Sequence, residues 1–85
     1  MKKKPGRGES IVSGIVTPSA WDENYNVISV KISASGEKEY LIDTQGKGKE
    51  LFGCVREHIK VLGKLRHDLE GKRIITVEEF EKVQP

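Results

Sequence analysis

The sequence is poor in the features that mark an exported, disulfide-bonded or membrane-spanning protein. Its single cysteine, Cys54, excludes an internal disulfide, so a reducing compartment, by default the cytoplasm, is expected. No apolar run approaches the roughly 20 residues that a transmembrane helix requires. The positively charged start, residues 1–10, has no apolar stretch behind it, so we expect no signal peptide.

Uncompensated positive charge is also scarce beyond the N-terminus. Residues 1–9 hold four basic side chains and one acidic side chain, whereas the remaining 76 residues hold 11 basic and 12 acidic ones. We predict that residues 1–9 form a flexible basic tail and that residues 10–85 form a single domain. Because nucleic-acid binding requires positive charge along a groove, the near-neutral domain does not favour it.

Residues suited to catalysis or metal binding are few and widely spaced. His58 and His67 are nine positions apart and lack a matching ligand pair, so no zinc site is predicted. No histidine stands at a spacing that would force a couple with Cys54, and we expect a buried thiol there. The stretch 46–49 lacks the spacing of a nucleotide-binding loop and is interpreted as a turn before a helix. The sequence therefore predicts no enzymatic activity, no cofactor and no metal.

The sequence does contain several runs rich in β-branched residues. Pro18 is expected to end the first of them. In the second run, Ile28, Val30 and Ile32 alternate with polar residues and are expected to face a core. The predicted strands are residues 11–17, 27–33, 38–43, 59–66 and 73–77.

Between the third and fourth predicted strands the apolar period changes to that of a helix. Leu51, Phe52 and Val55 fall at helical spacing, which predicts a helix of about ten residues from Lys49. Gly53 would destabilise such a helix, so we expect it where the helix closely approaches a packed neighbour.

The order of these elements predicts the fold. Three strands, one helix and two further strands follow the order of the oligonucleotide/oligosaccharide-binding (OB) fold, an all-β five-stranded barrel. Gly14 and Gly63 lie in the middle of the first and fourth strands in a shared pattern, apolar-x-Gly-x-apolar, and are expected to let the barrel bend. An SH3-like barrel is the main alternative, and the predicted helix argues against it.

Several short motifs resemble a group of short bacterial OB-fold-like proteins. The resemblance spans about residues 11–80 and rests on strand glycines, turns and the start of the helix, so it implies the fold and no functional residue. The motifs are Gly14-Ile15-Val16, Trp21-Asp22-Glu23, Asn26-Val27, Glu39-Tyr40-Leu41, the stretch 46–51, Val61-Leu62-Gly63-Lys64-Leu65, Gly71-Lys72 and Ile75-Thr76-Val77.

An OB barrel binds oligonucleotides on its second and third strands and the adjoining loops. There the sequence places aromatic and basic residues, whose combination suits the stacking of bases beside phosphates. However, Asp22 and Glu23 lie among them and would repel phosphate, and Trp21 could instead cover the barrel end. The candidate ligand-binding residues are Trp21, Tyr25, Lys31, Lys38, Tyr40, Arg66, His67 and Lys72.

The sequence is compatible with two functions. The first is a non-catalytic module, monomeric or weakly dimeric, that binds a protein or another macromolecule. Exposed Ile15, Leu62 and Leu69, or an uncovered strand edge, would then contact the partner. The second is weak binding of single-stranded nucleic acid through the second and third strands, assisted by Lys2–Lys4 and Arg7. The near-neutral domain favours the first.

Overall fold

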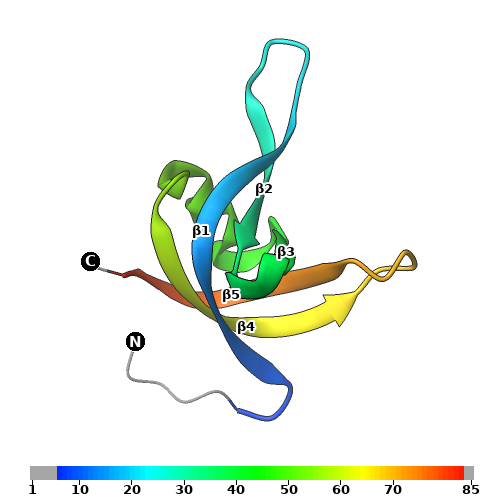
Figure 1. Ribbon diagram of the computed structural model, residues 1–85, viewed down its shortest axis with the longest axis vertical. Coiled ribbons are helices and arrows are strands. Elements are labelled where there is room, and N and C mark those ends of the chain that lie inside the picture. The colour runs from blue at the N-terminus through cyan, green and yellow to red at the C-terminus, as the bar shows by residue number, and fades with distance from the viewer. Residues whose placement is uncertain (1–5, 84–85) are drawn as a thin grey trace.

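Five strands and two short 3-10 helices form the fold. The computed structural model describes residues 6–83 (Figure 1). Its strands are β1 (Glu9–Trp21), β2 (Val27–Ser33), β3 (Glu39–Ile42), β4 (His58–His67) and β5 (Arg73–Lys82). The 3-10 helix η1 (Ser35–Glu37) turns the chain between β2 and β3, and η2 (Gly46–Cys54) connects β3 to β4. Each predicted strand is present.

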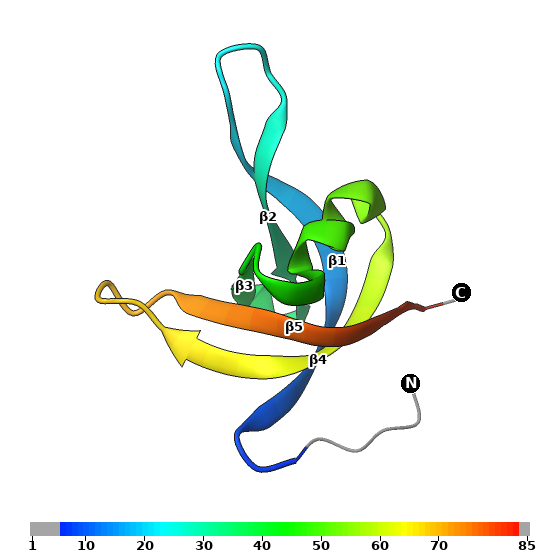
Figure 2. The same ribbon diagram turned by 180° about the vertical axis from the view of Figure 1, so that it is seen from behind.

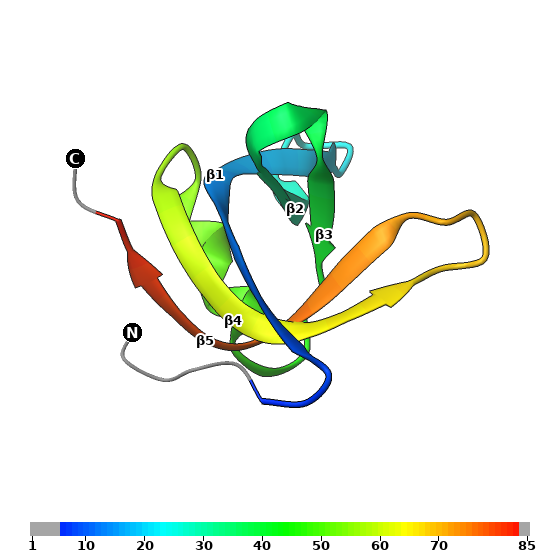
Figure 3. The same ribbon diagram turned by 60° about the horizontal axis from the view of Figure 1, so that its bottom comes forward.

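The strands close into a barrel in the order β1-β2-β3-β5-β4. β1 is long enough to pair with two neighbours, with β2 through residues 15–21 and with β4 through residues 9–15 (Figure 3). All pairings are antiparallel except that of β3 with β5. With a helical segment between β3 and β4, this closed barrel has the predicted OB arrangement.

Alternate residues of the strands fill the barrel. Val30 and Ile32 are fully buried, as predicted, and η2 lies against β5 and β2, where it adds Leu51 to the core (Figure 2). The prediction for Ile28 was wrong, because this side chain is 53% exposed. β2 no longer pairs with β3 at this position, and its register with β1 shifts there, so Ile28 lies outside the barrel.

The helical segment differs from the prediction in type, position and the role of its glycines. It is a 3-10 helix that ends at Cys54, shortly before Arg56 adopts a φ of 72° and the chain turns into β4. Gly53 is exposed with no neighbour within 4 Å of an added Cβ, so the prediction that it packs closely was wrong. The close approach occurs at Gly48, where a Cβ would overlap the backbone oxygen of Asp43.

The two mid-strand glycines, which were expected to let the barrel bend, lie where neighbouring strands pass close to each other. A Cβ added at Gly14 would overlap the backbone oxygen of Ser33 and lie 2.8 Å from Cγ2 of Ile32. A Cβ at Gly63 would overlap the backbone oxygen of Thr76, next to a register shift between β4 and β5. Both glycines are buried, so side chains at these positions would force neighbouring strands apart.

Two hairpins extend beyond the barrel, and the first is longer than predicted. β1 continues through Pro18, which pairs with Val30 beside a register shift and lies past the end of the β4 pairing, where a missing N–H is tolerated. β5 continues past Val77 to Lys82 and pairs with β4 on both sides of a register shift between Leu62 and Gly63. We call residues 18–30 the β1–β2 arm and residues 65–73 the β4–β5 arm; they point in different directions (Figures 1 and 3).

Candidate binding face

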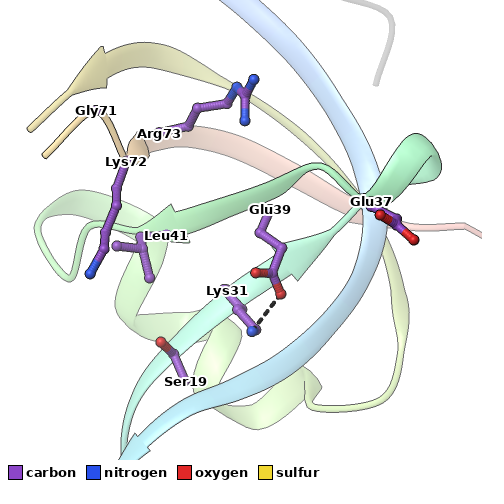
Figure 4. A pocket seen from close by; sticks show the side chains of 8 residues that line it. All are labelled: Ser19, Lys31, Glu37, Glu39, Leu41, Gly71, Lys72 and Arg73. Atoms are coloured by element: carbon purple, nitrogen blue, oxygen red, sulfur yellow. Dashed lines mark ion pairs between the residues drawn. The ribbon is translucent and has the colours of Figure 1, made fainter.

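A cleft of about 390 Å³ lies over β2 and β3, with the base of the β1–β2 arm on one side and the turn of the β4–β5 arm on the other. In Figure 4 the side chains of Ser19, Lys31 and Glu39 lie close together, and Lys72 extends alongside Leu41. Leu41 is the single apolar residue of the lining. The lining residues are Ser19, Lys31, Glu37, Glu39, Leu41, Gly71, Lys72 and Arg73.

Carboxylates neutralise most of the positive charge around this cleft. Lys31 forms an ion pair with Glu39 on the neighbouring strand, and Lys72 lies 3.6 Å from Glu70 within its own turn. Arg73, the third cation of the lining, places its guanidinium carbon 5.9 Å from the centre of the Tyr40 ring. The cleft is therefore polar and mixed in charge.

Asp43, directly after β3, joins three parts of the barrel. Its backbone N–H donates to the carbonyl of Ile75 at 2.9 Å, and its carboxylate accepts hydrogen bonds from Gln45 N–H, Arg66 and Thr76 at 3.0, 3.0 and 3.3 Å. The backbone N–H of Gln45, followed by the Arg66 guanidinium, holds the pKa of Asp43 below its usual range. This carboxylate supports the short β3–β5 pairing, which has only two register pairs.

Both arms end in the same five-residue turn. Asp22 Oδ1 accepts the backbone N–H groups two and four positions later at 2.8 and 2.9 Å, and Asp68 Oδ1 accepts the corresponding groups at 2.9 Å each. The fourth residue of each turn has a positive φ, 83° at Gly71 and 64° at Tyr25. The turns differ at that position, because only one of them has glycine there.

The aromatic candidates separate into an outer pair and an inner residue. Trp21 is 54% exposed at the end of β1, and Tyr25 is 86% exposed in the turn that follows, so Trp21 lies on the surface and does not cover the barrel end. Tyr40 is half-buried and packs against the core, so its ring does not lie on the outer side of β3.

The basic candidates are dispersed. Lys31 and Lys72 lie in the cleft, whereas Arg66 is bound to Asp43. Lys38 and His67 are both exposed, Lys38 between η1 and β3 and His67 at the end of β4. Of the tail candidates, Lys2–Lys4 fall outside the described residues.

Sequence reasoning missed several lining residues of the cleft. Ser19 was missed because Pro18 was expected to end the first strand. Arg73 was missed because it was assigned only a structural place, at the start of the fifth strand. Glu39 and Leu41 were missed because three apolar residues in a row, 40–42, conceal the phase of β3. The core position of Ile42 fixes that phase and turns Leu41 outward.

The three apolar residues proposed as partner contacts differ in exposure. Leu69 is fully exposed on the β4–β5 arm, and Ile15 is exposed on the outer side of β1. Leu62 was predicted to be exposed and is fully buried, so that prediction was wrong. Leu62 lies on the outer side of the sheet. Its neighbours directly across the sheet are Ile11 on β1 and Glu79 on β5, and they flank its side chain.

The remaining reactive groups lie apart from the cleft. Burial, followed by the hydrogen bond and charge of Glu57, raises the pKa of the Cys54 thiol. His58 and His67 lie at opposite ends of β4, and His58 Nε2 is 2.9 Å from Ser13 Oγ. Within residues 6–83 no group of three or more His, Cys, Asp or Glu residues is placed to hold a metal ion.

Comparisons with known proteins add no family to this description. No protein-family model matches the chain, and no significant match is found among curated proteins. Across the described residues, no helix combines the length and the apolar character needed to span a bilayer.

Proposed function

We propose that the chain is a non-catalytic binding module that holds a segment of another protein in the cleft between its two arms. The observation that carries the proposal is the cleft itself, which combines one apolar residue, Leu41, with charged groups of both signs. Such a lining offers hydrogen-bond donors and acceptors to a peptide backbone and one apolar contact to a side chain.

The charge balance of the cleft favours a polypeptide over a nucleic acid. Phosphate binding releases counterions only where positive charge is uncompensated. Here Lys31 and Lys72 are each paired with a carboxylate, and Glu37 adds a further negative charge to the lining. A nucleic-acid strand would have to displace these carboxylates, whereas a peptide could use both signs.

The reactive groups support a role without catalysis. A thiol whose pKa is raised is a poor nucleophile, and Cys54 is buried away from the cleft lining. Neither His58 nor His67 belongs to that lining. A single cysteine also suits a reducing compartment, so a cytoplasmic location is part of the proposal.

Weak binding of single-stranded nucleic acid is the second candidate. Exposed Trp21 and Tyr25 on one arm could stack on bases, and Arg73 and Lys72 on the other could contact phosphates. Oligonucleotide-binding OB folds use the corresponding face and loops. This candidate is second because the acidic residues of the cleft and of the β1–β2 arm repel phosphate.

Selection from a displayed peptide library, followed by affinity measurement of the enriched peptides, tests the proposal. We expect Leu41→Gln to weaken those peptides about fivefold, since it removes one half-buried apolar contact. Leu69→Ala, an exposed leucine outside the cleft, is the matched control and should bind like the wild type. No enrichment, or equal affinity for the wild type and Leu41→Gln, would reject the cleft. Tighter binding of oligothymidylate at low salt would favour nucleic acid.

The proposed module acts as a monomer or a weak homodimer. Both arms have strand edges that lack a second neighbour, and Ile11 and Ile15 are partly exposed on the outer side of β1. Light scattering at two protein concentrations tests this, and a tight dimer at the lower concentration would contradict it.

A further inference from the structure

The tip of the β1–β2 arm carries exposed apolar residues close together in the hairpin. Trp21, Tyr25 and Ile28 are 54%, 86% and 53% exposed. Trp21 pairs with Val27, next to Ile28, and Tyr25 lies in the turn between the two strands. Large aromatic side chains of this kind dominate the binding energy of many protein interfaces.

The turn at the tip of the β1–β2 arm does not require an aromatic residue at the position of Tyr25. The matching turn of the β4–β5 arm has the same hydrogen bonds from backbone N–H groups and has glycine, Gly71, at the equivalent position. A non-glycine residue with a φ of 64° is disfavoured by contacts of its own Cβ. Residues held in such conformations concentrate at binding and catalytic sites.

The charge of the arm selects the chemistry of the partner. Within residues 18–30 the only charged side chains are Asp22 and Glu23, both exposed, so the arm has a net charge of −2. Carboxylates beside aromatic rings attract cations, because the ring face also carries negative charge density. They repel phosphate, which makes stacking of nucleic-acid bases on the same rings unfavourable.

We propose that the tip of the β1–β2 arm binds a basic polypeptide segment, with Arg or Lys side chains of the partner against the rings of Trp21 and Tyr25 and beside the carboxylate of Glu23. The placement of Arg73 against the Tyr40 ring is an example of such a contact within the chain itself. The proposal rests on the proposed function in one respect, that the ligand is a polypeptide. It concerns a different surface, since Trp21, Tyr25 and Ile28 are not part of the cleft lining.

Calorimetric titration at low salt with a peptide of alternating Arg and Ser residues tests the arm, with a Glu-Ser peptide of equal length as the reference ligand. We expect the Arg-Ser peptide to bind and to change the emission of Trp21, the only tryptophan. Tyr25→Gly should weaken binding about three- to tenfold, as expected for a lost cation–π contact. Tyr25→Phe, which keeps the ring, should retain the affinity.

The same variants separate binding from folding. Tyr25→Gly should raise the urea midpoint while it weakens binding, because glycine adopts this φ without strain. Leu69→Ala, on the tip of the opposite arm, should leave peptide affinity unchanged. Equal affinity of Tyr25→Gly and the wild type, or equal binding of the Glu-Ser peptide, would overturn the arm site. Binding lost only in Leu41→Gln would overturn it too and would leave the cleft proposal intact.

Discussion

Gly14 is a residue at which β1 passes close to β2. An added Cβ would overlap Ser33 and press on Ile32, a fully buried core residue. We therefore predict that Gly14→Ala lowers the free energy of unfolding by roughly 1–3 kcal/mol, the usual range for overpacking. Gly53→Ala is the matched control, since its Cβ would meet open space, and it should raise stability by about 0.4–1 kcal/mol. Urea unfolding followed by far-ultraviolet circular dichroism measures both, and a neutral Gly14→Ala would contradict the close approach.

Gly71 permits a left-handed turn residue that an L side chain would disfavour. Because Gly71 has a φ of 83°, Gly71→Ala should destabilise the protein by roughly 1–2 kcal/mol. Space is not the cause, because an added Cβ would have no neighbour within 4 Å. The urea midpoint of Gly71→Ala should fall while that of Tyr25→Gly rises, and a shift of both in the same direction would contradict the equivalence of the two turns.

At the scale of elements, the pairing of β3 with β5 depends on Asp43. We predict that Asp43→Asn lowers stability at neutral pH by about 1 kcal/mol, a modest value because Arg66 is solvent-exposed. The folded pKa of Asp43 lies below its unfolded value of about 4. Its contribution is thus present above that unfolded value and is lost as the pH falls through the folded pKa. Urea midpoints measured against pH should show the two proteins converging below about pH 4. A constant difference would argue against the ionised carboxylate.

The arms should be less protected than the barrel from which they extend. Residues 19–21 and 27–29 belong to a two-stranded hairpin, whereas residues 59–62 pair with strands on both sides. Local opening requires less free energy where few buried contacts hold a segment. We predict that amide hydrogens exchange faster in the β1–β2 arm than in the middle of β4. NMR measures this exchange residue by residue. Equal protection would indicate that the arm is held by contacts beyond its own pairing.

For the whole molecule, closure of the barrel joins the first strand to the fourth. Residues 9–15 pair with residues 58–64, so the chain must close a long loop before this pairing forms. Proteins with such non-local pairing fold on timescales of about milliseconds to seconds. Stopped-flow circular dichroism should find refolding in this range, and a microsecond phase that carries the whole amplitude would contradict it.

The sequence predicted the barrel better than the candidate binding face, for a physical reason. Burial of one face imposes a period of two, and the bounds of β2 could be predicted from it. Ile28 continues the same period but lies on the arm, because the point where β2 leaves the barrel depends on the length of β3 and not on β2 itself. The close approach of Gly48 to Asp43 was likewise not predicted, because it depends on how η2 meets the end of β3.

The position of Trp21 determines what its fluorescence can report. The emission of a buried indole follows unfolding of the core, whereas Trp21 is 54% exposed while the barrel is intact. Thermal or chemical melts that rely on intrinsic emission should therefore understate loss of the native fold. Because Trp21 is exposed, the fluorescence emission of the unmodified protein should change chiefly when a ligand binds to the β1–β2 arm.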